Sequence, residues 1–256
     1  MIHLAFVLLK GSLLRKAKLP KPDQLVDVLK KRAPGLGFWA EPADDPKLQQ
    51  DIHSIGFDGG RVIVMMVPAA VPDNEADQGF EFSISSWSKS FRKPDHNAHL
   101  MVTLQLDDEL SASDAQRLFT RVLAGVIEAS NAVGVYWGQA SVSHPSDFFL
   151  DVVNGDEDFW VMLWTGVSRA SPQPDRISLL SLGMEQLGIA NLQVSGPSSM
   201  NQDLLMSFFQ LLGYAIERGE VIPDGDTVGS SADERLKVRH EPSPIDPGKT
   251  IWCIDY

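Results

Sequence analysis

The sequence contains one cysteine, Cys253, among 256 residues. A single cysteine cannot form an intramolecular disulfide, and it has no second thiolate at the spacing that a zinc site needs. Free cysteine is among the residue types most often buried. We therefore expect Cys253 to be a small buried side chain in a strand near the end of the chain.

Long apolar runs are also missing. No stretch reaches the roughly 18 apolar residues that a membrane-spanning helix requires. Residues 2–9 are apolar, but no basic residue precedes them and Lys10 follows them, which is the reverse of the order in a secretory signal. We interpret residues 2–9 as a first strand and expect a soluble, cytoplasmic protein with no membrane partner.

Basic residues are scarce relative to acidic ones. Lysine and arginine total 22 against 34 for aspartate and glutamate, which gives a net charge of −12. Direct binding to nucleic acid is disfavoured, because contacts with phosphate need a basic surface. With 43% hydrophobic and 22% charged residues, the composition is that of an ordinary globular chain that can bury a core.

Common catalytic signatures are absent as well. Gly35-Leu36-Gly37 is followed by aromatic residues, and the sequence contains no Gly-Lys-Ser/Thr phosphate loop. It also lacks the Gly-x-Ser-x-Gly elbow of many hydrolases and the paired-histidine helix of zinc peptidases. These absences argue against nucleotide hydrolysis by a phosphate loop and against the common hydrolase classes.

The rest of the chain alternates between strand-like and helix-like segments. The turn Asp58-Gly59-Gly60 between two β-prone runs predicts a hairpin, and Asp23 is expected to cap the first helix. By periodicity and propensity, helices are expected at residues 23–33, 111–130, 145–153 and 201–218, with a polar loop at 71–77. Strands are expected at residues 2–9, 52–57, 62–67, 99–106, 133–142, 159–167, 177–182, 191–195, 236–240 and 250–255.

The two long helices resemble each other. Phe119 and Leu123 of the first match Phe208 and Leu212 of the second at a constant offset, and strands precede each helix. This pattern indicates a degenerate internal duplication of a strand, strand, helix unit, although chance similarity between amphipathic helices explains it as well.

Runs of strands separated by single long helices favour the α+β class. We expect mostly antiparallel sheets with helices on one face. The sequence is consistent with one globular unit over residues 1–256, with candidate halves at 1–144 and 145–256.

Two acidic clusters stand out in the middle of the chain. The first precedes a helix and the second precedes an expected strand, and their members are Asp107, Asp108 and Glu109, and Asp156, Glu157 and Asp158. Residues 107–158 include ten acidic residues and two arginines. Solvated caps and turns explain each cluster singly, and calcium is a lesser option because the ligand spacing of a calcium loop is missing. If both clusters share one face, their summed field attracts a basic partner.

A second candidate site is a strand in which alternation would place Trp137, Gln139 and Ser141 on one face, with His144 nearby. Such a row could line a pocket of an enzyme or a small-molecule binder, although tryptophan on a strand is more often a core residue. Ser141, His144 and Asp147 have the residue types of a catalytic triad, but their spacing does not establish the hydrogen-bond chain.

A metal site is the weaker possibility in the sequence. Asp95, His96 and His99 could meet a cation if the backbone turned between them. Exposed histidines in a loop are the commoner outcome, and we assign no metal and no cofactor.

Three motifs carry a resemblance to a known family. They are Tyr136-Trp137-Gly138, the octapeptide SLGMEQLG at residues 181–188, and DGDTVG at residues 224–229 together with residues 248–255. In these motifs the chain resembles the bacterial DUF4261 family, a domain of unknown function, over most of residues 60–255. The motifs are turn glycines and aromatic strand positions, so the resemblance implies structural roles and no catalytic residues. Where similar chains accompany toxin-delivery genes, such as those of type VI secretion, they resemble immunity factors.

The leading hypothesis is a non-catalytic immunity protein that binds and neutralises a basic toxin such as a nuclease. The two acidic clusters would pair with the cationic surface of the toxin, and Trp87 or Trp137 would anchor the contact. Blocking could equally act by breaking a toxin dimer. The alternatives are an enzyme or small-molecule binder at the Trp137 strand, and a scaffold that dimerises through an aromatic strand edge. The sequence leaves both monomer and dimer open.

Overall fold

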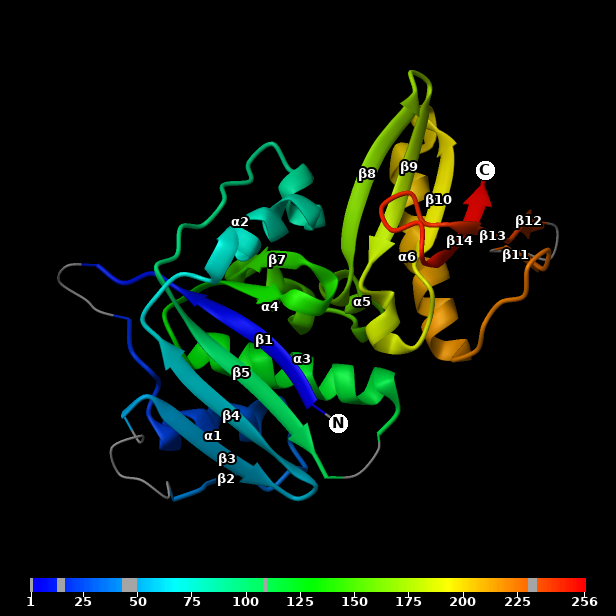
Figure 1. Cartoon of the computed structure of the whole chain (residues 1–256). Coiled ribbons are helices and arrows are strands. Elements are labelled where there is room, and N and C mark those ends of the chain that lie inside the picture. Colours follow the sequence, from blue (N-terminus) through cyan, green and yellow to red (C-terminus); the bar gives the residue numbers. More distant parts are fainter. Residues whose placement is uncertain (1, 13–16, 43–49, 108–109, 230–233) are drawn as a thin grey trace. The chain divides into compact units, whose positions relative to one another are not determined.

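The computed structural model describes residues 2–12, 17–42, 50–107, 110–229 and 234–256 (Figure 1). The chain divides into two compact units, Met1–Leu163 and Trp164–Tyr256. This boundary follows Leu163, whereas the candidate halves from the sequence meet at residues 144 and 145. That residues 1–256 form one globular unit stays a prediction.

The first unit is built on a seven-stranded sheet, sheet A, whose strand order is β2-β3-β4-β5-β1-β6-β7. Every neighbouring pair in it is antiparallel. The bounds of its strands are β1 Ile2–Leu9, β2 Trp39–Ala40, β3 Ile52–Phe57, β4 Gly60–Val67, β5 Ala98–Leu106, β6 Ala132–Trp137 and β7 Val142–Pro145.

Two long helices cover one face of sheet A, here called the inner face (Figure 1). They are α1 (Pro22–Arg32) and α3 (Ala112–Ala129), and the side chains of Ala5, Val7 and Leu9 point toward them from β1 with at most 2% exposure. Strand alternation then places the intervening residues of β1 on the opposite, outer face.

Shorter helices complete the first unit. The bounds are α2 Glu75–Gly79, α4 Ser146–Asn154 and α5 Val161–Trp164, with the 3-10 helices η2 Pro72–Asn74, η3 Phe80–Phe82, η4 Ile84–Trp87, η5 Gly138–Ala140 and η6 Glu157–Phe159. Helix α5 ends at the boundary, since Trp164 is the first residue of the second unit.

The second unit contains a five-stranded sheet, sheet B, in the order β13-β14-β10-β9-β8, and a two-stranded ribbon of β11 and β12. In sheet B only β10 and β14 pair in parallel. Helix α6 (Asn201–Arg218) packs on this sheet. The strand bounds are β8 Gly166–Gln173, β9 Arg176–Leu182, β10 Leu192–Pro197, β11 Thr227–Val228, β12 Leu236–Lys237, β13 Arg239–Pro242 and β14 Thr250–Asp255, and the 3-10 helices are η7 Met184–Leu187 and η8 Ser198–Met200.

The predicted fold class is therefore confirmed: the chain is α+β with mostly antiparallel sheets. The duplication is not confirmed. Both 18-residue helices follow an antiparallel strand pair, β4 with β5 before α3 and β9 with β10 before α6, but the strand orders of the two sheets differ.

Three predicted strands were wrong. The strand at 133–142 is interrupted by η5 and by Ser141, whose φ of 50° reverses the chain into β7. The strand at 159–167 is replaced up to residue 164 by η6 and α5, because successive backbone N–H groups bond to carbonyls three residues back. The strand at 236–240 is divided between the ribbon and sheet B.

Two further local predictions were also wrong. Asp23 does not cap α1: the N-cap is Lys21 without a side-chain hydrogen bond, and Pro22 begins the helix with its φ already suited to it. The loop at 71–77 contains η2 and the start of α2.

The prediction for Cys253 is confirmed. Its side chain is free and 3% exposed in β14, and burial raises the pKa of the thiol to about 12. The thiol is therefore protonated at neutral pH and packs as an apolar side chain.

A substitution of Trp137 tests the core of the first unit. Its indole is fully buried and lies edge-on to Phe119 of α3, with ring centroids 5.4 Å apart. Trp137→Ala should lower the free energy of unfolding by about 3–5 kcal/mol, because it leaves a large cavity between sheet and helix. Urea denaturation followed by circular dichroism measures this. Gln139→Ala, at an exposed position two residues later, is the control and should change stability little; equal effects would contradict the assignment of Trp137 to the core.

Candidate functional site

Helix α3 follows the first predicted acidic cluster in the chain and contacts the second. Asp107 is exposed at the end of β5, from which the chain enters α3. Glu157 of the second cluster accepts hydrogen bonds from Arg117 and Arg121, both on α3. The remaining members of the first cluster, Asp108 and Glu109, lie outside the described residues.

The second cluster has one paired carboxylate and two exposed ones. Glu157 forms ion pairs with both arginines of α3, so its charge is compensated. Asp156 caps η6 by accepting a hydrogen bond from the backbone N–H of Asp158 at 3.1 Å, and both aspartates are exposed. Asp156 and Asp158 therefore keep carboxylate oxygens directed to solvent on either side of a fixed glutamate.

An exposed aromatic side chain accompanies these aspartates. Phe159 is 41% exposed, whereas the next residue, Trp160, is 3% exposed with Arg121 stacked 5.4 Å from its ring centroid. We call Asp114, Asp156, Asp158 and Phe159 the α3 acidic surface, since Asp114 is exposed on α3 one turn before Arg117.

Sequence reasoning missed Phe159 because residues 159–167 were interpreted as a strand. The available signal was the run Asp156-Glu157-Asp158, since an aspartate followed by acidic residues is typical of a helical N-terminus.

The structure contradicts one of the two predicted anchors. Trp137 is fully buried in the core and offers no surface to a partner. Trp87 is half-buried at the end of η4, a segment separate from η6, so nothing places it on the α3 acidic surface.

The alternative site at the Trp137 strand does not form a row. Strand β6 ends at Trp137, Gln139 lies exposed in η5, and Ser141 is exposed in the left-handed region. The predicted common face is lost because η5 reverses the chain between the two strands.

His144, which belonged to that row, is instead buried in a hydrogen-bond chain. Its Nε2 lies 3.3 Å from the carbonyl oxygen of Leu163, so Nε2 carries the proton and donates. The Nδ1 atom is then an acceptor, and the Ser83 hydroxyl donates to it at 2.8 Å, while Ser85 hydrogen-bonds to Ser83. Ser83 and His144 are both fully buried, so this pair fixes η4 against β7.

The three residues with the types of a catalytic triad are not assembled into one either. Ser141 is exposed, and the carboxylate of Asp147 accepts a hydrogen bond from the backbone N–H of Phe148. The side chains of these two residues therefore do not join the buried chain of His144.

The candidate metal ligands have other partners. The backbone N–H of Val71 donates to Nε2 of His96 at 3.3 Å, Nδ1 of His99 donates to the Ala69 carbonyl at 2.8 Å, and Asp95 pairs with Lys10. Over the described ranges, no group of three or more metal-ligating side chains is placed to hold an ion.

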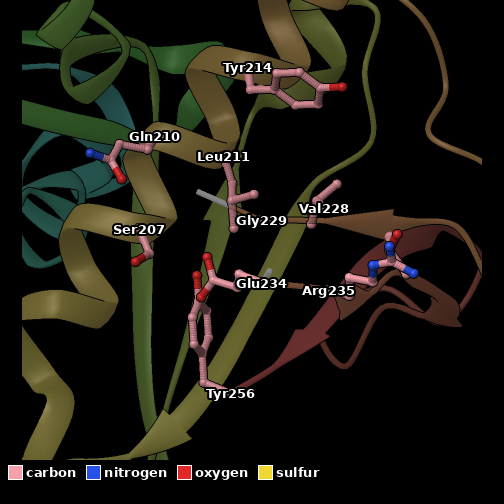
Figure 2. Close-up of a pocket in the computed structure, with 10 residues that line it drawn as sticks. Ser207, Gln210, Leu211, Tyr214, Val228, Gly229, Glu234, Arg235 and Tyr256 are labelled. Atoms are coloured by element: carbon pink, nitrogen blue, oxygen red, sulfur yellow. The ribbon is translucent and has the colours of Figure 1, made fainter. Parts of the chain in front are cut away.

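A pocket of about 390 Å³ lies in the second unit, between α6, the β11–β12 ribbon and the end of the chain (Figure 2). Tyr256 hydrogen-bonds to Ser207 within it, and burial raises the pKa of Tyr256. Its size is in the range of small-ligand pockets. The lining residues are Ser207, Gln210, Leu211, Tyr214, Thr227, Val228, Gly229, Glu234, Arg235 and Tyr256. A small-molecule hypothesis thus has a described cavity in the second unit.

The glycine-bearing motifs shape turns of the second unit. In the loop between β9 and β10, the Asn191 side chain accepts from the Met184 backbone N–H at 3.1 Å and donates to Glu185 at 3.1 Å. Gly183 and Gly188 flank η7 with φ of 87° and 75°. The SLGMEQLG motif is therefore explained by backbone geometry.

The DGDTVG motif has the same kind of role. Gly225 has φ of 82°, and the Asp224 side chain accepts from the backbone N–H of His240 at 2.8 Å. A Cβ on Gly229 would lie 2.1 Å from the carbonyl oxygen of Glu234, so no larger residue fits there without a backbone shift.

A comparison with protein families finds a match in the second unit. A family model described as domain of unknown function (DUF4261) matches residues 180–254. This segment includes both glycine-bearing motifs, whereas Tyr136-Trp137-Gly138 lies outside it. The resemblance is thus supported for the second unit, and the matched description names no activity. Comparison with the curated proteins and with the solved structures finds no match.

None of the described helices is long and apolar enough to cross a membrane.

The buried chain of His144 predicts a pH dependence of stability. Burial lowers the pKa of His144 from 6.5 to about 4, so the folded protein keeps a neutral ring where the unfolded chain takes up a proton. The stability that depends on the neutral ring is complete above about pH 6.5 and is lost as the pH falls toward 4, which amounts to about 3 kcal/mol.

Urea denaturation at pH 7 and at pH 5 measures this loss. His144→Gln should be less stable at pH 7 and should lose less stability between the two pH values. Because the other histidines remain in both proteins, the difference between the curves isolates His144. If the free energies of unfolding of the two proteins fell equally between pH 7 and pH 5, the pH dependence could not be assigned to His144.

Proposed function

We propose that the chain is a non-catalytic bacterial protein that binds a basic protein partner through the α3 acidic surface. Its specific role in this proposal is that of an immunity protein, which neutralises a cationic toxin such as a nuclease. The observation that carries the proposal is the exposure of Asp156, Asp158 and Phe159 on one short segment that is tied to α3.

The geometry of the segment suits a cationic partner. Because Arg117 and Arg121 compensate Glu157, the free charge is on Asp156, Asp158 and Asp114. Lysine or arginine side chains of a partner can approach these carboxylates from solvent without displacing an existing ion pair. The net charge of −12 adds a long-range attraction that accelerates the encounter and weakens with salt.

Phe159 supplies an apolar contact, which the charged side chains alone do not provide. Exposed ion pairs contribute little binding free energy, about 0–1 kcal/mol each, whereas an aromatic side chain that becomes buried at the centre of an interface contributes more. In this proposal Phe159 takes the anchoring role that the sequence analysis gave to Trp87 or Trp137. A nuclease held in this way would lose access to phosphate through its basic surface, or would lose its own dimer contact.

The aspartates can be tested directly. Asp156→Asn with Asp158→Asn removes two charges, and an asparagine at 156 can still cap η6. With the product of the neighbouring gene as the partner, we expect the association rate to fall roughly tenfold at low ionic strength, and the difference to shrink as salt is raised. Biolayer interferometry over a salt series measures both effects.

The matched control is Asp203→Asn with Glu217→Gln, which removes two exposed charges from α6. It should reproduce only the smaller effect of net charge. Absence of any complex with either neighbouring gene product, or equal effects of the two double variants, would remove the proposal. Rescue of growth when the chain is co-expressed with the toxic partner tests the immunity role separately.

Phe159→Ala tests the anchor. Its loss should weaken the complex about tenfold or more through faster dissociation, because an interface aromatic acts mainly on the dissociation rate. Val221→Ala, at a side chain that is 63% exposed in the second unit, is the control and should leave binding unchanged. Wild-type dissociation kinetics in the Phe159→Ala variant would assign the contact to another surface.

A further inference from the structure

The outer face of sheet A is apolar but incompletely covered. On the inner face, Val62, Val64, Leu100 and Val102 are fully buried under the helices. On the outer face, residues 71–91 cover the end near Leu8 through Val71, Ala76 and Phe80, and Phe6 packs partly buried against this cluster. A sheet face built of large aliphatic side chains normally packs on another layer.

Strand register aligns the outer-face side chains into three rows. Read from β1 through β5 and β4 to β3, they are Ile2, Gln105, Arg61 and Gly56; then Leu4, Thr103, Ile63 and Ser54; and then Phe6, Met101, Met65 and Ile52. Trp39 of β2 extends the first row, because its ring lies against Gly56, where an added Cβ would be 2.6 Å away.

These side chains remain accessible in the centre of the sheet, not only at its edges. Ile2 is 67% exposed, Leu4 is 37% exposed and Trp39 is 46% exposed. Ile63, Met65, Met101 and Thr103 are each partly exposed. Isolated apolar side chains on a surface are ordinary, but a contiguous set across five strands indicates an interaction surface.

The charge of this face distinguishes it from the rest of the chain. Arg61 is the charged residue in the three rows, and it pairs with Glu41 at 3.8 Å. The polar members are Gln105, Thr103 and Ser54, which carry both donors and acceptors without charge. Two copies of a chain of net charge −12 repel each other at long range, but this face places no unpaired charge of the three rows inside a contact between copies. A basic partner, by contrast, gains nothing electrostatic here.

The size of the face sets the expected affinity. Five strands at about 4.8 Å spacing and three rows along the strands give a projected area on the order of 400 Å². A stable interface buries about 800 Å² from each partner. The corrugation of the side chains raises the accessible area above this projected area. The face is still at the lower end of the areas that protein interfaces bury, and interfaces of that size associate reversibly.

We propose that the outer face of sheet A is a homodimer interface, in which two copies pack sheet against sheet about a two-fold axis. Rows of Ile, Leu and Met side chains would interdigitate as in other face-to-face sheets. In a two-fold contact the same patch serves both copies, so the neutral rows face each other. This inference is independent of the proposed function, because α3 and the acidic surface belong to the helical layer on the other side of the sheet.

Sedimentation velocity of the full chain from 1 to 200 µM tests the interface. The wild-type mass should rise with concentration toward that of a dimer. Leu4→Glu places two carboxylates near the axis and should raise the dimer dissociation constant at least tenfold. Circular dichroism and urea denaturation establish whether the Leu4→Glu variant is folded. If it is unfolded, Ile63→Glu is used in its place.

The control is Val221→Glu, which adds the same charge at an exposed apolar position of the second unit. It should dimerise like the wild type. Mixing Leu4→Glu with Leu4→Lys should restore dimers at a concentration at which each variant alone is monomeric. A wild-type chain that stays monomeric at 200 µM, or a loss of dimer equal in Val221→Glu and Leu4→Glu, would overturn the proposal.

Discussion

Strand β1 lies between β5 and β6, and the alternation of its side chains determines what each face of sheet A can do. Its inward residues meet α3, where the ring of His3 lies 5.7 Å from that of Phe119. Its outward residues meet the short helices near Leu8 and are exposed near Ile2. Because a shift of one residue would exchange the two sets, the register with β5 preserves the core and the open face together.

Packing, more than charge, holds the α3 acidic surface in place. The ion pairs of Glu157 with Arg117 and Arg121 are partly exposed, and such pairs contribute about 0–1 kcal/mol each. The indole of Trp160, which is 3% exposed, removes far more apolar area from water. The arginines therefore orient the segment, while burial of Trp160 keeps it folded. Asp156, Asp158 and Phe159 stay exposed because their neighbours hold the segment in place.

Elements with strong periodicity and clear ends were predictable from the sequence. Strands β1 and β14 and helix α6 have the predicted bounds, and Gly219 ends α6 with φ of 64° as a glycine stop does. The error at 159–167 arose because Trp160 and Trp164 have high strand propensity, whereas the cap at Asp156 decided the local structure. The burial of Trp137 agrees with the commoner core role of a tryptophan on a strand, but its contact with Phe119 on a distant helix could not be predicted. The exposure of the outer face could not be predicted either. The alternation of apolar and polar residues along a strand indicates two faces, but it does not say which face a second layer covers.

The two surfaces of the first unit differ in the physical reason for their accessibility. On the α3 acidic surface, carboxylates are exposed because hydration of charge makes exposure favourable, so a partner must compensate their desolvation with opposite charge. On the outer face, aliphatic side chains are exposed although water disfavours it, so any matching apolar surface gains free energy by covering them. In the two proposals, the first surface therefore selects its partner by charge and the second selects its partner by shape. Since they lie on opposite layers of sheet A, a dimer formed through the outer face would present two acidic surfaces, and a partner with two basic sites would then bind with a raised effective concentration.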